Sequence, residues 1–215
     1  MTEVVVHGVP GSPYLRTVLL TLSEKGAPHR LAAMGMGQAR SPEHLARHPF
    51  ARIPVIDHGD FQLYETQAIV RYLDAVFDGP SLRPTDPREA ARADQICGIV
   101  DWYLFPKVSA TIGWNRVIVP RLLGGTPDEA AIAAAVPDAR TTFDALNRLI
   151  GDQPFAAGQT LSIADLMLVP HLDFLAETPE GADLLAGTAL SGWLGRMRER
   201  PSAIATRPEW LGQAA

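Results

Sequence analysis

The chain passes from its first strand into its first helix at Gly11-Ser12-Pro13-Tyr14-Leu15-Arg16. The valines at 4–6 before this segment form an apolar run typical of a short buried strand, and the glycines and prolines of residues 7–11 predict a loop. Ser12 followed by Pro13 is typical of a helix N-cap followed by proline at the first helical position. We therefore expect a helix from residue 13, which carries an apolar stripe at helical spacing (Leu15, Val18, Leu19 and Leu22) and ends at Gly26.

Ser12 admits two interpretations. A serine hydroxyl beside the free N–H groups of a helix start lies where an anion would be stabilised. The simpler interpretation is that Ser12 only caps the helix, which contributes about 0.5–2 kcal/mol. No G-x-S-x-G pattern surrounds Ser12, so the sequence gives no support for the nucleophile elbow of a hydrolase.

The composition is that of an ordinary globular protein. Among 215 residues, 47% are apolar and 20% are charged, which is enough material for one large domain or two small ones. The net charge is −5 without a basic cluster, so we expect neither nucleic acid nor an anionic membrane as a partner. No apolar run approaches the ~18–20 residues of a membrane span.

The N-terminus and the cysteine content indicate a cytoplasmic protein. Residues 1–3 lead directly into the first strand, without a basic region or the apolar core of a signal peptide. Cys97 is the single cysteine, which excludes an intramolecular disulfide and a zinc cage of the usual Cys/His kind. We expect no metal centre.

The rest of the first half predicts a small α/β domain. Residues 29–34 follow the first helix as a second strand, and this strand–helix–strand order favours a parallel pair. The glycine-containing loop at 35–41 lacks a phosphate-binding motif and is interpreted as a connector before a short helix at 42–48. Residues 52–57 and 61–65 predict a β-hairpin, in which the isomer of the bond before Pro54 stays open. Thr66 is expected to cap a helix with the apolar stripe Ile69, Tyr72, Leu73 and Val76.

The second half is expected to be all-helical. Residues 78–87 contain three prolines and one glycine and are the best linker candidate. A long helix or a bent pair is predicted from 88 to about 123, with Pro106 and Pro120 as kink points. Thr126-Pro127-Asp128-Glu129 predicts a capping box and a helix that Pro137 kinks, Ser162 and Asp165 predict a second box, and a final helix is expected over 190–200.

These segments together resemble the cytosolic glutathione S-transferase family over nearly the whole chain, and within it the serine-type, phi-like bacterial members. The residues that carry the resemblance are Gly11-Ser12-Pro13 with Arg16, Arg52-Ile53-Pro54-Val55, Glu65-Thr66-Gln67-Ala68-Ile69 and Leu161-Ser162-Ile163-Ala164-Asp165. The resemblance implies a thioredoxin-like domain over residues 1–78, a linker over 79–87, an all-helical domain over 88–215, and a homodimer.

The resemblance also implies roles for single residues. Ser12 matches the active-site serine, and Glu65 and Thr66 match the pair that holds the γ-glutamyl end of glutathione. Ile53 matches the residue whose backbone pairs with the cysteine of glutathione, directly before the family's cis-proline at Pro54. Two basic residues match contacts to the tripeptide: Arg52 matches a lysine or glutamine that contacts it, and Arg40 matches a basic residue near its glycine carboxylate.

The sequence departs from the family pattern at several positions. Thr66 replaces the usual serine, His48 stands where asparagine often precedes the proline, and Ala51 replaces the common glycine. His7 occupies roughly the place of the tyrosine in tyrosine-type members. The zeta-type Ser-Ser-Cys signature and the active-site cysteine of the beta and omega types are missing.

The chemistry that the resemblance implies is thiol ionisation. A hydrogen bond from Ser12 and the positive end of the helix would favour the thiolate of glutathione, the co-substrate. The thiolate would attack a small hydrophobic electrophile, whose site we expect between the domains. Tyr14, Trp102, Phe105 and Trp114 are candidates for the wall of that site, although aromatic residues at helical spacing are more often core residues. Cys97 and His171 are expected to be structural, and Asp165 to be a cap first.

Three classes of function stay open at this point. The first is a glutathione-conjugating enzyme, and the second is a glutathione-dependent peroxidase, dehalogenase or isomerase on the same site. The third is a non-catalytic relative that binds ligands or partners. The joint presence of Ser12, Glu65 and Thr66 argues against the third class, because a protein without turnover has no need of all of them.

Overall fold

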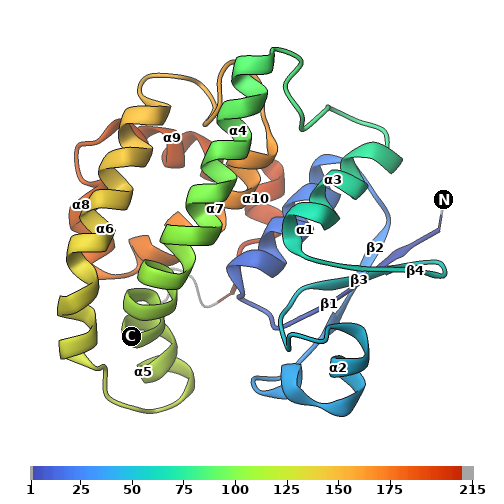
Figure 1. Cartoon of the computed structure of the whole chain (residues 1–215), viewed down its shortest axis with the longest axis horizontal. Helices are drawn as coiled ribbons and strands as arrows, with labels where there is room; N and C mark the ends of the chain where they lie inside the picture. Colours follow the sequence, from blue (N-terminus) through green and yellow to red (C-terminus); the bar gives the residue numbers. More distant parts are fainter. Residues whose placement is uncertain (1, 210–215) are drawn as a thin grey trace. The chain divides into compact units, whose positions relative to one another are not determined.

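The computed structural model describes residues 2–209 (Figure 1). Its contacts divide the chain into two units: residues up to Leu82 together with Pro201–Pro208, and Arg83–Arg200. The sequence-based domain limits stay a prediction, and each unit is described by itself below.

The first unit has a four-stranded sheet in the order β2-β1-β3-β4. Strands β1 and β2 are parallel, as the strand–helix–strand order predicts, while β3 and β4 form the expected antiparallel hairpin. Helices α1 and α3 lie on one side of the sheet and α2 lies on the other (Figure 1). The elements are β1 (Val4–Gly8), α1 (Pro13–Glu24), β2 (His29–Ala33), the 3-10 turn η1 (Gln38–Arg40), α2 (Pro42–Arg47), β3 (Val55–His58), β4 (Phe61–Tyr64), α3 (Thr66–Val76) and α10 (Pro201–Ala205).

The core of this unit lies between the sheet and helices α1 and α3. Apolar residues of β1 and β3 meet the predicted stripes of both helices, namely Val4, Val6, Ile56, Leu15, Val18, Leu22, Ile69 and Leu73. The prediction of the apolar stripe of α3 is wrong at its last position, because Val76 is 43% exposed and Phe77, just beyond the helix, is buried instead. The short helix α10 joins α1 through the buried Arg16, whose guanidinium donates to the Ala203 carbonyl at 3.1 Å.

The second unit is built from helices around α7 (Ile163–Ala176). Residues 163–175 of α7 are all buried, so this helix is the centre of the unit. The surrounding elements are α4 (Pro87–Ile99), η2 (Val100–Ile118), α5 (Val119–Leu122), α6 (Glu129–Ile150), α8 (Pro179–Leu185) and α9 (Ala189–Arg198). The long helix predicted from residue 88 is thus continuous but not uniform: η2 is a π-helix that contains Pro106. Helix α8, like α10 of the first unit, was not predicted.

A buried carboxylate ties the start of α7 to two other segments. Asp165 accepts the N–H and the hydroxyl proton of Ser162, each at 2.9 Å, the Ala156 N–H at 2.7 Å and the Trp193 indole N–H at 3.0 Å. This confirms that Asp165 acts as a cap. Burial raises the pKa of Asp165, and these four donors oppose the shift.

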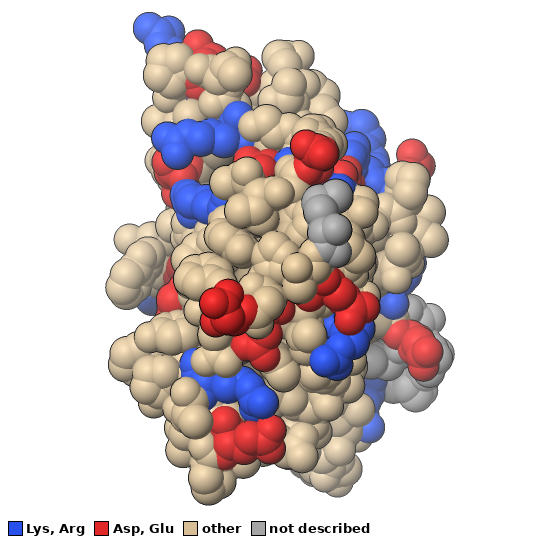
Figure 2. Space-filling model, turned by 90° about the vertical axis from the view of Figure 1, so that its right-hand side faces the viewer, with Lys and Arg blue, Asp and Glu red and all other residues tan. Residues whose placement is uncertain are grey.

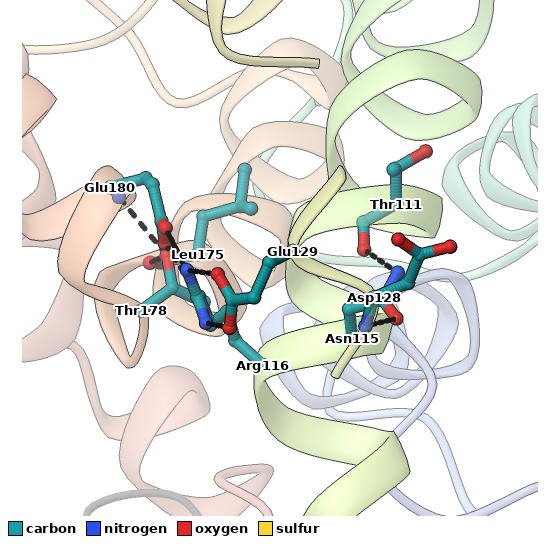
Figure 3. A network of polar contacts seen from close by, with 9 residues as sticks. Thr111, Asn115, Arg116, Asp128, Glu129, Leu175, Thr178 and Glu180 are labelled. Atoms are coloured by element: carbon teal, nitrogen blue, oxygen red, sulfur yellow. Dashed lines mark hydrogen bonds and ion pairs between the residues drawn. The ribbon is translucent and has the colours of Figure 1, made fainter. Parts of the chain in front are cut away.

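Arg116 of η2 lies between two carboxylates (Figure 3). Its guanidinium donates to Glu180 with bonds of 2.6 to 3.2 Å and to Glu129 with bonds of 2.6 and 2.9 Å. Hydrogen bonding to Glu180, then to Glu129, raises the pKa of Arg116, and Arg116 lowers the pKa of Glu180. The Arg116 guanidinium therefore joins η2 to the first turns of α6 and α8. The N-cap of α6 is Asp128 and not the predicted Thr126, because the Asp128 side chain accepts the Ala131 N–H.

The surface shown in Figure 2 carries charges of both signs among uncharged residues, without a broad patch of one sign. Within residues 2–209, no helix combines the length and apolarity that crossing a membrane requires.

Candidate active site

Three chain segments leave the sheet at one edge. His7 of β1 pairs with Val55 of β3, and Val55 pairs with Tyr64 of β4. Because β3 is antiparallel to both β1 and β4, the end of β1, the start of β3 and the end of β4 lie at the same edge of the sheet. The register therefore brings together the Ser12 loop, the Ile53–Pro54 segment and the Glu65–Thr66 corner.

The turn from β1 into α1 is tight because of two glycines. A Cβ at Gly8 would lie 2.9 Å from the Leu15 side chain, and Gly11 has φ of 89°, a region that favours glycine. Ser12 then caps α1, as predicted, with its Oγ accepting the Leu15 N–H at 3.5 Å. Within residues 2–209 its O–H proton has no protein acceptor, and the first turn of α1 carries no acidic side chain. Ser12 thus combines a hydroxyl donor with the positive end of a helix.

The segment before β3 presents backbone to the same edge. The Ile53–Pro54 bond is cis, which answers the question that the sequence left open. The carbonyl of Arg52 accepts a hydrogen bond from His44 Nε2 at 2.7 Å, while the Arg52 side chain is exposed.

The corner after β4 has an unusual backbone. Glu65 has φ of 73° and ψ of 111°, a conformation that costs a non-glycine residue about 1–3 kcal/mol and concentrates at ligand-binding sites. Glu65, and not the predicted Thr66, occupies the N-cap position of α3, and its side chain caps no N–H of the helix. The exposed carboxylate is therefore available to a ligand, with the buried Thr66 as the first helical residue beside it.

Comparisons with known proteins agree with this geometry. Family models described as the N-terminal and C-terminal domains of glutathione S-transferase match residues 6–81 and 129–196. Glutathione S-transferase hmp2 of Hypomyces subiculosus is 34% identical over 163 residues, which cover 74% of this chain and 76% of the relative. The chain belongs to the glutathione S-transferase family.

Full-length relatives support the same assignment. Glutathione S-transferase F6 of Arabidopsis thaliana is 26% identical over 208 residues, with 94% of this chain and 98% of the relative covered. The solved structure of glutathione S-transferase-I bound with lactoylglutathione has a TM-score of 0.82 and 27% identity, and covers 94% of this chain and 97% of that one. The thioredoxin-like first unit followed by a helical unit, which the resemblance implies, is therefore confirmed.

Two other candidates in the first unit have less defined surroundings. Arg40 ends η1 with an exposed side chain, and its guanidinium makes no hydrogen bond or ion pair in the described part of the chain. Tyr14 follows Pro13 in the first turn of α1 and is half-buried.

The aromatic candidates of this family member's helical unit differ in exposure. Trp102 is 75% and Trp114 is 42% exposed, so neither is a core residue of this unit. Phe105 is partly buried, and its ring meets the ring of His171 edge-on at 5.8 Å. Their role at an electrophile site stays a prediction.

The residues expected to be structural are indeed buried. Cys97 is a buried free thiol. His171 is buried with its Nδ1 3.2 Å from the Ser109 hydroxyl, and burial lowers its pKa to about 3. No group of three or more His, Cys, Asp or Glu side chains is arranged to hold a metal ion within residues 2–209.

Sequence reasoning missed a pair of buried histidines beside the edge. His44 and His48 are each 2% exposed, with ring centroids 6.3 Å apart. The His48 ring packs against Tyr64 at 4.5 Å. Their spacing of four residues around the end of a short amphipathic helix was a signal that could have found them.

Proposed function

We propose that this protein is a glutathione transferase that binds glutathione along the sheet edge, ionises its thiol and conjugates it to an apolar electrophile. The observation that carries the proposal is the strand register through His7, Val55 and Tyr64, which gathers Ser12, Ile53 and Glu65 at one edge. The relative bound to lactoylglutathione, a glutathione derivative by its name, supports this choice of ligand.

Each segment of the edge offers a different group to the tripeptide. Glu65 supplies a carboxylate for the ammonium of the γ-glutamyl end, with the Thr66 hydroxyl beside it. The backbone of Ile53, held before the cis bond, pairs with the cysteine residue of glutathione. Arg52 and Arg40 supply cations, of which Arg40 is assigned to the glycine carboxylate.

Ser12 acts on the sulfur. A free thiol with a pKa of about 8.5 is only a few per cent thiolate at pH 7. The Ser12 O–H donates to the thiolate but can donate little to a neutral thiol, and the positive end of α1 favours the charged form in the same way. The thiolate then attacks the electrophilic carbon. Trp102, Phe105, Trp114 and Tyr14 are proposed to contact the electrophile.

Replacing Ser12 by alanine tests this assignment. A hydrogen bond to a charged group contributes about 1.5–3 kcal/mol, so the thiol pKa of bound glutathione should rise by about 1–2 units in Ser12→Ala. The ultraviolet absorbance of the thiolate measures that pKa, and the rate of conjugation to chlorodinitrobenzene at pH 6.5 should fall with it, while glutathione still binds.

Thr188→Ala is the matched control for loss of a helix cap. The Thr188 hydroxyl accepts the Ser191 N–H at 3.1 Å at the start of α9, in the other unit. This variant should lose a similar cap energy of about 1 kcal/mol and keep the bound thiol pKa. An unchanged thiol pKa in Ser12→Ala would refute the role of Ser12.

We further propose that the protein is cytoplasmic and that it is a homodimer, of which the resemblance implies the second. Phe50, which is 68% exposed in the single chain, is an apolar side chain that a second copy would cover. Sedimentation equilibrium measures the oligomeric state directly, and a monomer at micromolar concentration would contradict the proposed homodimer.

A further inference from the structure

We propose that His44 and His48 are positioning residues for the glutathione site, that they support two of its three chain segments, and that protonation of His48 weakens glutathione binding in acid. The inference rests on the proposed function, because it concerns the same ligand at the same sheet edge. In this proposal neither histidine binds glutathione directly. Each histidine holds in place a neighbouring segment that binds it.

His44 supports the segment before β3. Its backbone N–H is held by the Ser41 hydroxyl at 3.2 Å, which fixes the first turn of α2. Its ring Nε2 lies 2.7 Å from the Arg52 carbonyl oxygen. Because a carbonyl only accepts, Nε2 carries the proton in this bond. The ring is therefore anchored to α2 at one end and to the residue directly before Ile53 at the other.

His48 supports the corner after β4. It follows α2, and its own backbone N–H donates to the His44 carbonyl at 2.8 Å. Its ring lies 4.5 Å from that of Tyr64 at an interplanar angle of 33° and meets Phe50 edge-on at 6.1 Å. Tyr64 is the residue directly before Glu65, so the packed imidazole supports the chain where the backbone enters the unfavourable conformation of Glu65.

Both imidazoles have a buried nitrogen without a partner. Within the described residues, Nδ1 of His44 and Nδ1 of His48 are buried and make no hydrogen bond. A buried polar atom that is left unpaired costs about 1–3 kcal/mol. A purely structural site would be filled more favourably by apolar rings, so the retention of two imidazoles here points to a role for their chemistry.

The charges around His48 determine the direction of its pH effect. Burial lowers the pKa of His48, the carboxylate of Glu65 raises it, and His44 and Arg52 lower it further, so that the net shift is downward. His48 is therefore neutral at neutral pH. Once protonated, it places a cation within electrostatic reach of Glu65, the carboxylate that is proposed to bind the ammonium group of glutathione. A cation at His48 weakens the attraction of Glu65 for the ammonium group, so binding favours neutral His48, and affinity falls as the pH drops through the lowered pKa of His48, below the ordinary range of an imidazole.

The test uses S-methylglutathione, whose blocked sulfur removes thiol ionisation from the measurement. Isothermal titration of the full chain gives the Kd at pH 7.5 and pH 5.0. We expect the Kd of the wild type to rise by about fivefold or more in acid. His48→Phe keeps a ring against Tyr64 and should bind as the wild type does at pH 7.5 but show a smaller rise. His48→Ala, which loses the ring, should bind more weakly at both pH values.

His58→Phe is the matched control. His58 lies on β3 at the end away from the edge, where its ring bonds to the Tyr72 hydroxyl at 2.8 Å, and this variant should keep the wild-type rise in Kd. By linkage, saturating ligand should also lower the pKa of His48, measured by NMR, by at least the logarithm of the part of the fold-change that His48→Phe removes. Equal pH slopes in wild type and His48→Phe would overturn the inference while leaving the proposed function intact. Failure of the wild type to bind at pH 7.5 would overturn both.

Discussion

Replacement of Asp165 by asparagine should destabilise the helical unit strongly, although it changes neither volume nor shape. The carboxylate is fully buried and accepts four hydrogen bonds, two on each oxygen. An asparagine side chain keeps one oxygen and replaces the other by an NH₂ group, which only donates. Whichever way the amide turns, its NH₂ group faces donors that have lost their acceptor.

The two orientations differ in cost. With NH₂ in place of Oδ1, the Ala156 N–H and the Trp193 indole N–H both lose their acceptor, at about 1–3 kcal/mol each. With NH₂ in place of Oδ2, the Ser162 N–H loses its acceptor, while the Ser162 hydroxyl can turn and accept instead. The second orientation is cheaper, and the loss of charge from the remaining bonds adds to it. We expect about 2–4 kcal/mol in total, against a stability of about 5–15 kcal/mol for a typical domain.

Urea unfolding followed by circular dichroism and by tryptophan fluorescence measures this loss. With a denaturant slope of about 3 kcal/mol per molar, the midpoint should fall by about 1 M. Asp128→Asn is the matched control, because Asp128 is an exposed N-cap whose Oδ1 accepts the Ala131 N–H at 3.0 Å, and asparagine caps equally well. Midpoints of the two variants that agree within about 0.2 M would refute the argument that the Asp165 charge organises the start of α7.

Two further predictions concern the same unit. Arg116→Lys should lose about 1–2 kcal/mol in urea unfolding, because a lysine cannot reproduce the planar guanidinium that bonds to two carboxylates. The control is Arg121→Lys, whose arginine has an ion pair with Glu177 at 3.7 Å and which should lose less than about 0.5 kcal/mol. Equal losses in the two variants would contradict the importance of the Arg116 guanidinium. His171 has a pKa of about 3 in the folded chain and about 6.5 in the unfolded chain, so between these values only the unfolded chain binds the proton. Stability therefore falls with falling pH, by up to about 1.4 kcal/mol per pH unit. His171→Gln should reduce this slope between pH 6.5 and 5, and an unaltered slope would show that other groups cause it.

The turn into α1 could be predicted because its signals are local. A serine before a proline and a helical stripe that begins two residues later identify the cap without knowledge of the fold. Parallel pairing of the first two strands followed from the order of elements alone. The resemblance then supplied the residues of the edge, but not the register that brings them together, since the strand predicted over 52–57 begins only at Val55.

Where tertiary contacts decide, the local signals failed. Capping preference favours Thr66 over glutamate, yet Glu65 occupies the cap of α3 because the strand before it ends there. The α3 stripe extends by periodicity to Val76, but the chain turns extended at Phe77 and buries that ring instead. The π-helical segment η2 gives no separate signal, because an apolar stripe is compatible with both helix types.

The distribution of unfavourable backbone argues that the sheet edge is the functional part of the first unit. In the described residues, Ala51 and Glu65 are the only two non-glycine residues with positive φ, at 54° and 73°. They lie in the two segments that flank β3 and β4 at this edge, and His48 contacts both places, since its carbonyl accepts the Ala51 N–H at 3.0 Å and its ring packs on Tyr64. Strain of this kind persists only where surrounding contacts hold it, and natural sequences keep it where a ligand needs the resulting geometry. If the edge had no ligand, a glycine at either position would relieve the strain without loss, so the glutathione affinity of Glu65→Gly compared with its stability separates the two interpretations.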